Sequence, residues 1–160
     1  MSGGIIIAAP ASGSGKTVLT LGLLRHLARA GHSVASAKTG PDYIDPSFHA
    51  AASGAPCLNL DPWAMRRTTI AALSAQLERS AEFVLCEGVM GLFDGAGLAG
   101  AGSTADLAAL TGWPVVLVVD AHGQAGSAAA DAGRARSSSA GTSTCSATWS
   151  AARARKSSSA

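Results

Sequence analysis

The first 120 residues alternate short apolar runs with longer stretches in which apolar residues recur at helical spacing. The short runs predict buried strands over residues 4–9, 33–38, 82–86 and 114–119. The longer stretches predict helices over residues 16–30, 66–80 and about 103–110. A further helix is predicted where Asp45 acts as the N-cap and Pro46 takes the first helical position. Strands that alternate with helices are typical of βαβ units, so the sequence predicts an α/β fold with a parallel sheet.

This pattern stops after about residue 130. Residues 133–160 hold nine Ser, seven Ala and five cations, with no strand-like run and no helical apolar stripe. We therefore divide the chain into a domain over residues 1–130 and a Ser/Ala/Arg-rich tail over residues 131–160. Two interpretations of the tail stay open, namely a disordered segment and a sequence that follows a shift of the reading frame.

Composition narrows the class of protein. The chain has 160 residues, 48% of them hydrophobic and 4% aromatic, which suits one folded domain and excludes a disordered protein. No apolar run is long enough to cross a bilayer, and the N-terminus lacks the pattern of a secretory signal. Three cysteines without a CxxC pair indicate neither a disulfide framework nor a zinc site. We therefore expect a cytoplasmic protein without a membrane partner.

The formal net charge of +2 hides an uneven distribution. Five of the twelve Lys and Arg residues follow residue 132, whereas all ten acidic residues precede it. Residues 1–132 therefore carry seven cations against ten acids, a net charge of −3. A nucleic-acid partner is not expected, because the domain has no basic excess with which to bind phosphate backbones.

A phosphate-binding loop lies between the first predicted strand and the first predicted helix. Residues 10–17 match the P-loop pattern GxxxxGK[ST], except that Pro10 stands in place of the first Gly. Small residues let successive backbone N–H groups curve around phosphate oxygens, and the helix N-terminus adds positive partial charge. Lys16 is expected to reach the β- and γ-phosphates, and the Thr17 hydroxyl to bind Mg²⁺. The residues predicted to bind ATP are Ser12, Gly13, Ser14, Gly15, Lys16 and Thr17.

Charged residues at the ends of strands are the other candidates. Glu87 ends a predicted strand, where a carboxylate ligand for the Mg²⁺ of Mg²⁺–ATP is expected, and Asp42 is a second candidate ligand. The Lys38 amine is a candidate to stabilise charge on a phosphoryl group in transfer. Alternatives stay open: Glu87 and Lys38 as solvated residues, and Asp45 as a helix cap. His49 is expected at the surface, and Cys86 as a small buried apolar residue.

Three motifs together resemble the N-terminal domain of cobyrinic acid a,c-diamide synthase, a family that includes the hydrogenobyrinic acid enzyme. They lie at residues 9–17, 38–46 and 87–95, and the resemblance extends over about residues 3–130. It implies a P-loop fold like that of dethiobiotin synthetase, incomplete at its C-terminal side. It also implies ATP-dependent amidation of the a- and c-carboxylates of a corrin acid in cobalamin biosynthesis, through an acyl phosphate. The resemblance implies Mg²⁺ held by Thr17 and Glu87, and a phosphoryl and ammonia site shaped by Asp42, Asp45 and Asp94.

The same resemblance implies a substrate, a donor of ammonia and an assembly. The corrin acid is the substrate, ammonia comes from a glutamine amidotransferase domain whose GxCxG elbow this sequence lacks, and a homodimer is a candidate assembly. Three alternatives stay open. They are a dethiobiotin synthetase-like ligase, a partitioning-type nucleotide switch and an inactive nucleotide-binding fragment. Ala11 stands where the partitioning ATPases carry a signature lysine, which counts against the switch.

Overall fold

A parallel sheet of five strands forms the centre of the computed structural model, which describes residues 3–96, 100–122, 127, 129–130 and 133. The strands are β1 (Gly4–Ala8), β2 (Val34–Thr39), β3 (Cys57–Leu60), β4 (Phe83–Glu87) and β5 (Val115–Leu117). Their order across the sheet is β3-β2-β4-β1-β5, and each neighbouring pair is parallel. The α/β class predicted from the sequence is confirmed. The predicted tail, apart from residue 133, lies outside the described residues.

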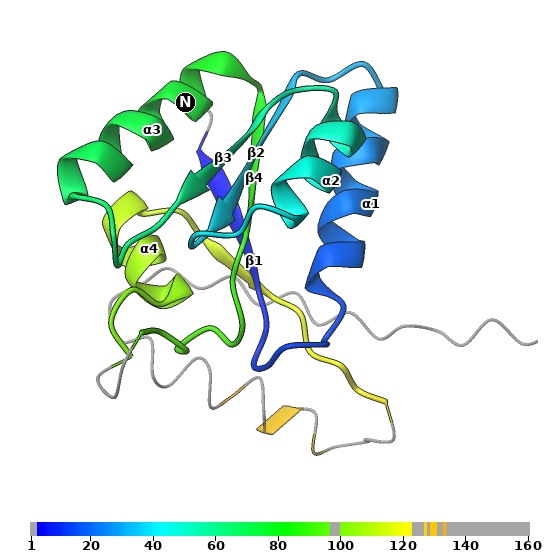
Figure 1. Cartoon of the computed structure of the whole chain (residues 1–160). Coiled ribbons are helices and arrows are strands. Elements are labelled where there is room, and N and C mark those ends of the chain that lie inside the picture. The colour runs from blue at the N-terminus through cyan, green and yellow to red at the C-terminus, as the bar shows by residue number, and fades with distance from the viewer. Residues whose placement is uncertain (1–2, 97–99, 123–126, 128, 131–132, 134–160) are drawn as a thin grey trace, which may run out of the picture.

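Among the described residues, two helices cover each face of the sheet. Figure 1 shows α1 (Lys16–Arg29) and α2 (Asp45–Ser53) on one face, and α3 (Arg67–Ser80) and α4 (Thr104–Thr111) on the other. Because side chains alternate between the two faces of a strand, β4 sends Val84 and Cys86 into the larger core with α3 and α4. It sends Leu85 toward Leu24 of α1. The burial expected for Cys86 is confirmed, and both faces of the sheet are covered as in other α/β folds.

Two predictions about local structure are wrong. No strand was predicted over β3, because its four residues are too few for a clear hydrophobic pattern. Asp45 is not the N-cap of α2, because the helix begins at Asp45 itself after Ile44, and the Asp45 side chain makes no capping hydrogen bond. The cap predicted for α4 is confirmed: Ser103 and Asp106 form a reciprocal capping box.

The register of the central strands determines where the site lies. Glu87, the last residue of β4, is paired with Ile7 of β1 on one side and with Lys38 of β2 on the other. The P-loop follows directly after β1, so the loop, Lys38 and Glu87 meet at the carboxyl edge of the sheet. No helix among the described residues is long and apolar enough to cross a membrane.

Candidate functional site

The P-loop presents an uncapped helix N-terminus at the carboxyl edge of the sheet. Gly15 is the N-cap of α1 with a φ of 87°, a left-handed conformation that a residue with a Cβ adopts only with strain. No side chain caps the helix, and its first turn carries no acidic residue. Backbone N–H groups are therefore available to an anion, and the helix dipole favours one there.

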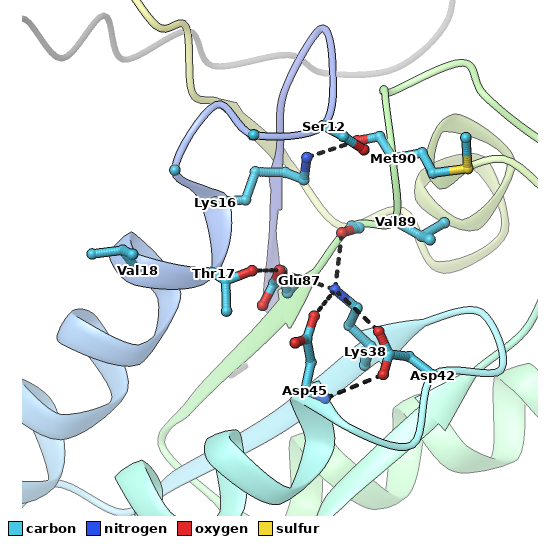
Figure 2. Close-up of a pocket in the computed structure, with 13 residues that line it drawn as sticks. Ser12, Lys16, Thr17, Val18, Lys38, Asp42, Asp45, Glu87, Val89 and Met90 are labelled. Carbon is cyan, nitrogen blue, oxygen red and sulfur yellow. Dashed lines mark hydrogen bonds and ion pairs between the residues drawn. The ribbon is translucent and has the colours of Figure 1, made fainter.

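Lys16 is buried, and its amine is held by backbone oxygens. The Lys16 Nζ donates to Met90 O at 2.7 Å (Figure 2). It also donates to Ala11 O at 3.2 Å. Burial lowers the pKa of Lys16, and the negative charge of Glu87 opposes part of that effect. Met90 has a φ of 48°, the one positive value at a non-glycine residue in the described part of the chain. Lys16 thus links the P-loop to the loop after β4.

Glu87 is the centre of the polar network. Its Oε1 accepts hydrogen bonds from the Thr17 hydroxyl at 2.6 Å and from Lys38 Nζ at 2.9 Å, while Oε2 lies 2.6 Å from His49 Nε2. The side chain is only 1% exposed, so the solvated role left open in the sequence analysis does not apply. Burial opposes its ionisation, but the bonds from His49 and Thr17 and the charge of Lys38 outweigh burial and lower the pKa of Glu87 to about 2.

Lys38 lies between carboxylates. Its Nζ is 2.7 Å from Asp45 Oδ2, 2.9 Å from Glu87 Oε1 and 4.0 Å from Asp42 Oδ2. Burial alone would lower the pKa of Lys38, but the hydrogen bond to Asp45 and the charge of Glu87 raise it instead. Asp42 organises its own loop, because its Oδ1 accepts from the backbone N–H groups of Ile44 and Asp45. Figure 2 shows Asp42 and Asp45 with Lys38 and Glu87 between them and the P-loop.

His49 is buried, which corrects the surface position expected for it. The side chain is 0% exposed, and its two ring nitrogens contact Glu87 and Cys57. Burial alone would lower the pKa of His49, but the hydrogen bonds to Cys57 and Glu87 raise it to about 9. The sequence pattern did not reveal this contact, because burial of His49 depends on how α2 packs against the sheet. Cys57 and Asn59, whose amide donates to Asp42 O, were missed together with β3.

Most of the predicted site residues line a cavity of about 460 Å³. The predicted residues in its lining are Ser12, Gly13, Gly15, Lys16, Thr17, Lys38, Asp42, Asp45 and Glu87. Ser14 and Asp94 are not among the lining residues. The Ser14 hydroxyl donates to Ala11 O, and Asp94 Oδ2 accepts from Gly91 N at 2.8 Å. The reactive role predicted for Asp94 stays a prediction, and its observed contact stabilises the loop after β4.

The donor set suits Mg²⁺ bound together with a nucleotide. No group of three or more His, Cys, Asp and Glu side chains forms a metal cage within the described ranges. Mg²⁺ normally keeps several waters and takes one or two protein oxygens beside substrate phosphates. The Thr17 hydroxyl and the Glu87 carboxylate supply two such oxygens next to the P-loop. The metal role predicted for Asp42 stays a prediction, since one of its oxygens is engaged by the backbone.

Comparison with known proteins identifies the family. The CobQ/CobB/MinD/ParA nucleotide binding domain family matches residues 5–136. The chain belongs to this family. The hydrogenobyrinate a,c-diamide synthase of Brucella anthropi is 61% identical over 128 residues, which are 79% of this chain and 29% of that protein. The synthase of the same name from Rhodobacter capsulatus is 58% identical over 132 residues, 81% of this chain and 30% of that protein. The one from Rhizobium meliloti is 57% identical over 117 residues, 73% and 27% of the respective chains.

These matches confirm the resemblance inferred from the three motifs, and the five-stranded parallel sheet with flanking helices agrees with the family. The chain spans less than a third of the length of these curated relatives.

Proposed function

We propose that this chain supplies the ATP-binding and phosphoryl-transfer site of a ligase that converts the a- and c-carboxylates of a corrin acid into amides. The substrate is of the hydrogenobyrinate or cobyrinate type, and the reaction belongs to cobalamin biosynthesis. Support comes from the P-loop beside Glu87 and Lys38, together with identities of 57–61% to three synthases. Those identities favour the synthase over a dethiobiotin synthetase-like ligase and over a partitioning-type switch.

The proposed reaction solves a leaving-group problem. A carboxylate does not react with ammonia, because it is a poor electrophile with no good leaving group. In the first step a carboxylate oxygen attacks the γ-phosphorus of ATP, the bond to the bridging oxygen breaks, and ADP leaves. In the second step ammonia adds to the acyl phosphate, loses a proton, and displaces inorganic phosphate. Each amide therefore consumes one ATP, and we propose glutamine as the normal source of ammonia, released by an amidotransferase partner.

The residues around the cavity divide these tasks. The N-terminus of α1 and Lys16 bind the phosphates, for which the amine turns from Met90 O toward the nucleotide. The Lys38 amine, aligned by Asp45, faces the phosphoryl group in transfer and stabilises its charge. When bound, Mg²⁺ supplies charge neutralisation on the phosphates, with Thr17 and Glu87 as its protein ligands. Asp42 and Asp45 lie at the other side of the cavity, where they orient Lys38 and polarise the acceptor site.

Trapping the acyl phosphate tests this proposal without an ammonia-releasing partner. The full chain is mixed with Mg²⁺–ATP, hydrogenobyrinic acid and hydroxylamine, which takes the place of ammonia and yields a hydroxamate. We expect ADP release that depends on the corrin acid, and a hydroxamate product identified by mass spectrometry. The Lys16→Ala variant is the matched control and should yield neither product. ADP release that is independent of the corrin acid, or nucleotide binding without any hydroxamate, would contradict the proposal.

A further inference from the structure

The contact between α2 and Glu87 has no part in the phosphoryl-transfer roles described above. Asp45 and His49 are four residues apart on α2, so they lie on the same face of the helix. Asp45 reaches Lys38 at 2.7 Å, and His49 reaches Glu87 at 2.6 Å. One helix face therefore contacts both members of the Lys38–Glu87 pair that neighbouring strands bring together.

The two oxygens of the Glu87 carboxylate have separate surroundings. Oε1 contacts Thr17 and Lys38, both of which line the cavity, whereas Oε2 contacts His49, which does not. The terminal torsion angle of a glutamate has a broad distribution, so a carboxylate without a fixed partner samples many orientations. A hydrogen bond from a fully buried ring to Oε2 fixes the carboxylate plane, and water does not compete for that bond.

The His49 ring is itself oriented from its other side. Its Nδ1 lies 3.5 Å from the Cys57 sulfur, and Cys57 is the first residue of β3. Both nitrogens thus have partners, one on β3 and one on β4. A series of contacts runs from Cys57 through His49 to Oε2 of Glu87, and it leaves Oε1 directed at the cavity.

We propose that His49 is a positioning residue, which holds Glu87 so that a single carboxylate oxygen faces the Mg²⁺ of bound ATP. This inference rests on the proposed function, because it assumes that Glu87 and Thr17 serve Mg²⁺–ATP. The Thr17 hydroxyl oxygen and Oε1 of Glu87, which lie 2.6 Å apart, are the two protein oxygens proposed to bind the metal ion. Groups that orient a metal ligand typically change metal affinity about 10- to 100-fold when they are removed.

Two carboxamide variants separate this role from simple core packing. In His49→Gln the amide nitrogen takes the place of Nε2 and retains a donor for Glu87. In His49→Asn the amide nitrogen takes the place of Nδ1, toward Cys57, and the donor to Glu87 is lost. Both variants replace a buried imidazole by a carboxamide and differ in the donor to Glu87. Asn also leaves one methylene more unfilled than Gln, and the melting temperature of each variant reports this packing difference separately.

The measurement is the affinity of the full chain for ATP, by isothermal titration calorimetry, in EDTA and again in excess Mg²⁺. The ratio of the two affinities reports how strongly bound ATP and the metal ion are coupled. We expect His49→Asn to lower this ratio about 10- to 100-fold while affinity in EDTA stays near that of the wild type, and His49→Gln to restore most of the ratio. Equal ratios in all three proteins overturn the inference.

Two further outcomes have defined meanings. If the wild type binds ATP equally well with and without Mg²⁺, the inference fails while nucleotide binding stands. If the wild type binds no ATP in either condition, the proposed function fails and the inference with it. Should the His49 variants fail to give a cooperative melt by circular dichroism, the pair Cys57→Ala and Cys57→Ser replaces them. The ratio is then expected to fall in the alanine variant and to recover in the serine variant, and equal ratios again overturn the inference.

Discussion

The buried pair of Glu87 and His49 predicts a bell-shaped dependence of stability on pH in metal-free buffer. The pKa of Glu87 is lowered from 4.5 to about 2, so its contribution is complete above pH 4.5 and is lost as the pH falls toward 2. The pKa of His49 is raised from 6.5 to about 9, so its contribution is complete below pH 6.5 and is lost as the pH rises through 9. Maximal stability is therefore expected between about pH 4.5 and 6.5.

The loss of stability on each side of this optimum, here called the acid limb and the alkaline limb, follows in size from these pKa shifts. One pKa unit corresponds to about 1.36 kcal/mol, so each limb amounts to about 3 kcal/mol in the free energy of unfolding. The His49–Glu87 contact, 2.6 Å long and almost fully buried, contributes to both limbs beside Cys57, Thr17 and Lys38, so this shared part is counted once at the optimum. A loss of about 3 kcal/mol is a substantial fraction of the free energy of unfolding of a typical domain, which is roughly 5 to 15 kcal/mol.

Urea unfolding in EDTA at intervals from about pH 2 to 10, followed by far-ultraviolet circular dichroism, measures both limbs. The His49→Gln variant cannot titrate and is expected to lose the alkaline limb, with a nearly flat free energy of unfolding from pH 6.5 to 9. The Cys57→Ser variant is the control for the neighbouring thiol, and its alkaline limb should remain. If His49→Gln keeps a limb of the wild-type size while Cys57→Ser loses it, the assignment to His49 is refuted.

Three other substitutions test the phosphate loop and its surroundings. Lys16→Ala removes a charge-assisted donor worth about 1.5 to 3 kcal/mol, so calorimetry should show ATP affinity at least 10-fold lower. In Gly91→Ala the new Cβ would lie 2.6 Å from the carbonyl oxygen of Pro10, so we expect about 1 to 3 kcal/mol of destabilisation in urea and weaker ATP binding. The control Gly22→Ala, in α1 with open space around it, should be neutral or stabilising by up to about 1 kcal/mol. Ser103→Ala removes the capping box and should cost about 1 kcal/mol in urea without changing ATP affinity; a drop in affinity would show that α4 supports the site.

Much of this fold follows from local patterns. The P-loop could be located because its residue types, together with a strand before and a helix after it, are tied to one geometry. Glu87 and Lys38 could be selected because parallel strands end at a common edge. The strand β3 escaped notice because four residues carry little periodicity, and its membership in the sheet depends on pairing with β2.

The contacts within the site follow from packing, which the sequence does not display directly. His49 resembles any polar residue on a short surface helix until α2 is placed against the sheet, where the ring becomes fully buried. Asp45 was expected to cap α2, but the carboxylate points to Lys38 and the turn before the helix is stabilised by Asp42 instead. In both cases a charged partner on a strand of the sheet decides the orientation of the side chain, namely Lys38 of β2 for Asp45 and Glu87 of β4 for His49.

The bond between Lys16 and the carbonyl of Met90 has a consequence for the order in which the substrates bind. A non-glycine residue at a φ of 48° stores roughly 1 to 3 kcal/mol of backbone strain, and the amine of Lys16 holds that turn in place. On the proposed function, a γ-phosphate that binds the amine would release this turn, and the strain given up would offset part of the cost of reshaping the loop around a second reactant. On the proposed function, we predict that nucleotide binds before the acid, because until then Lys16 stays bonded to the loop after β4. The expected outcome is an ordered rather than a random addition of the two substrates, which steady-state kinetics would measure.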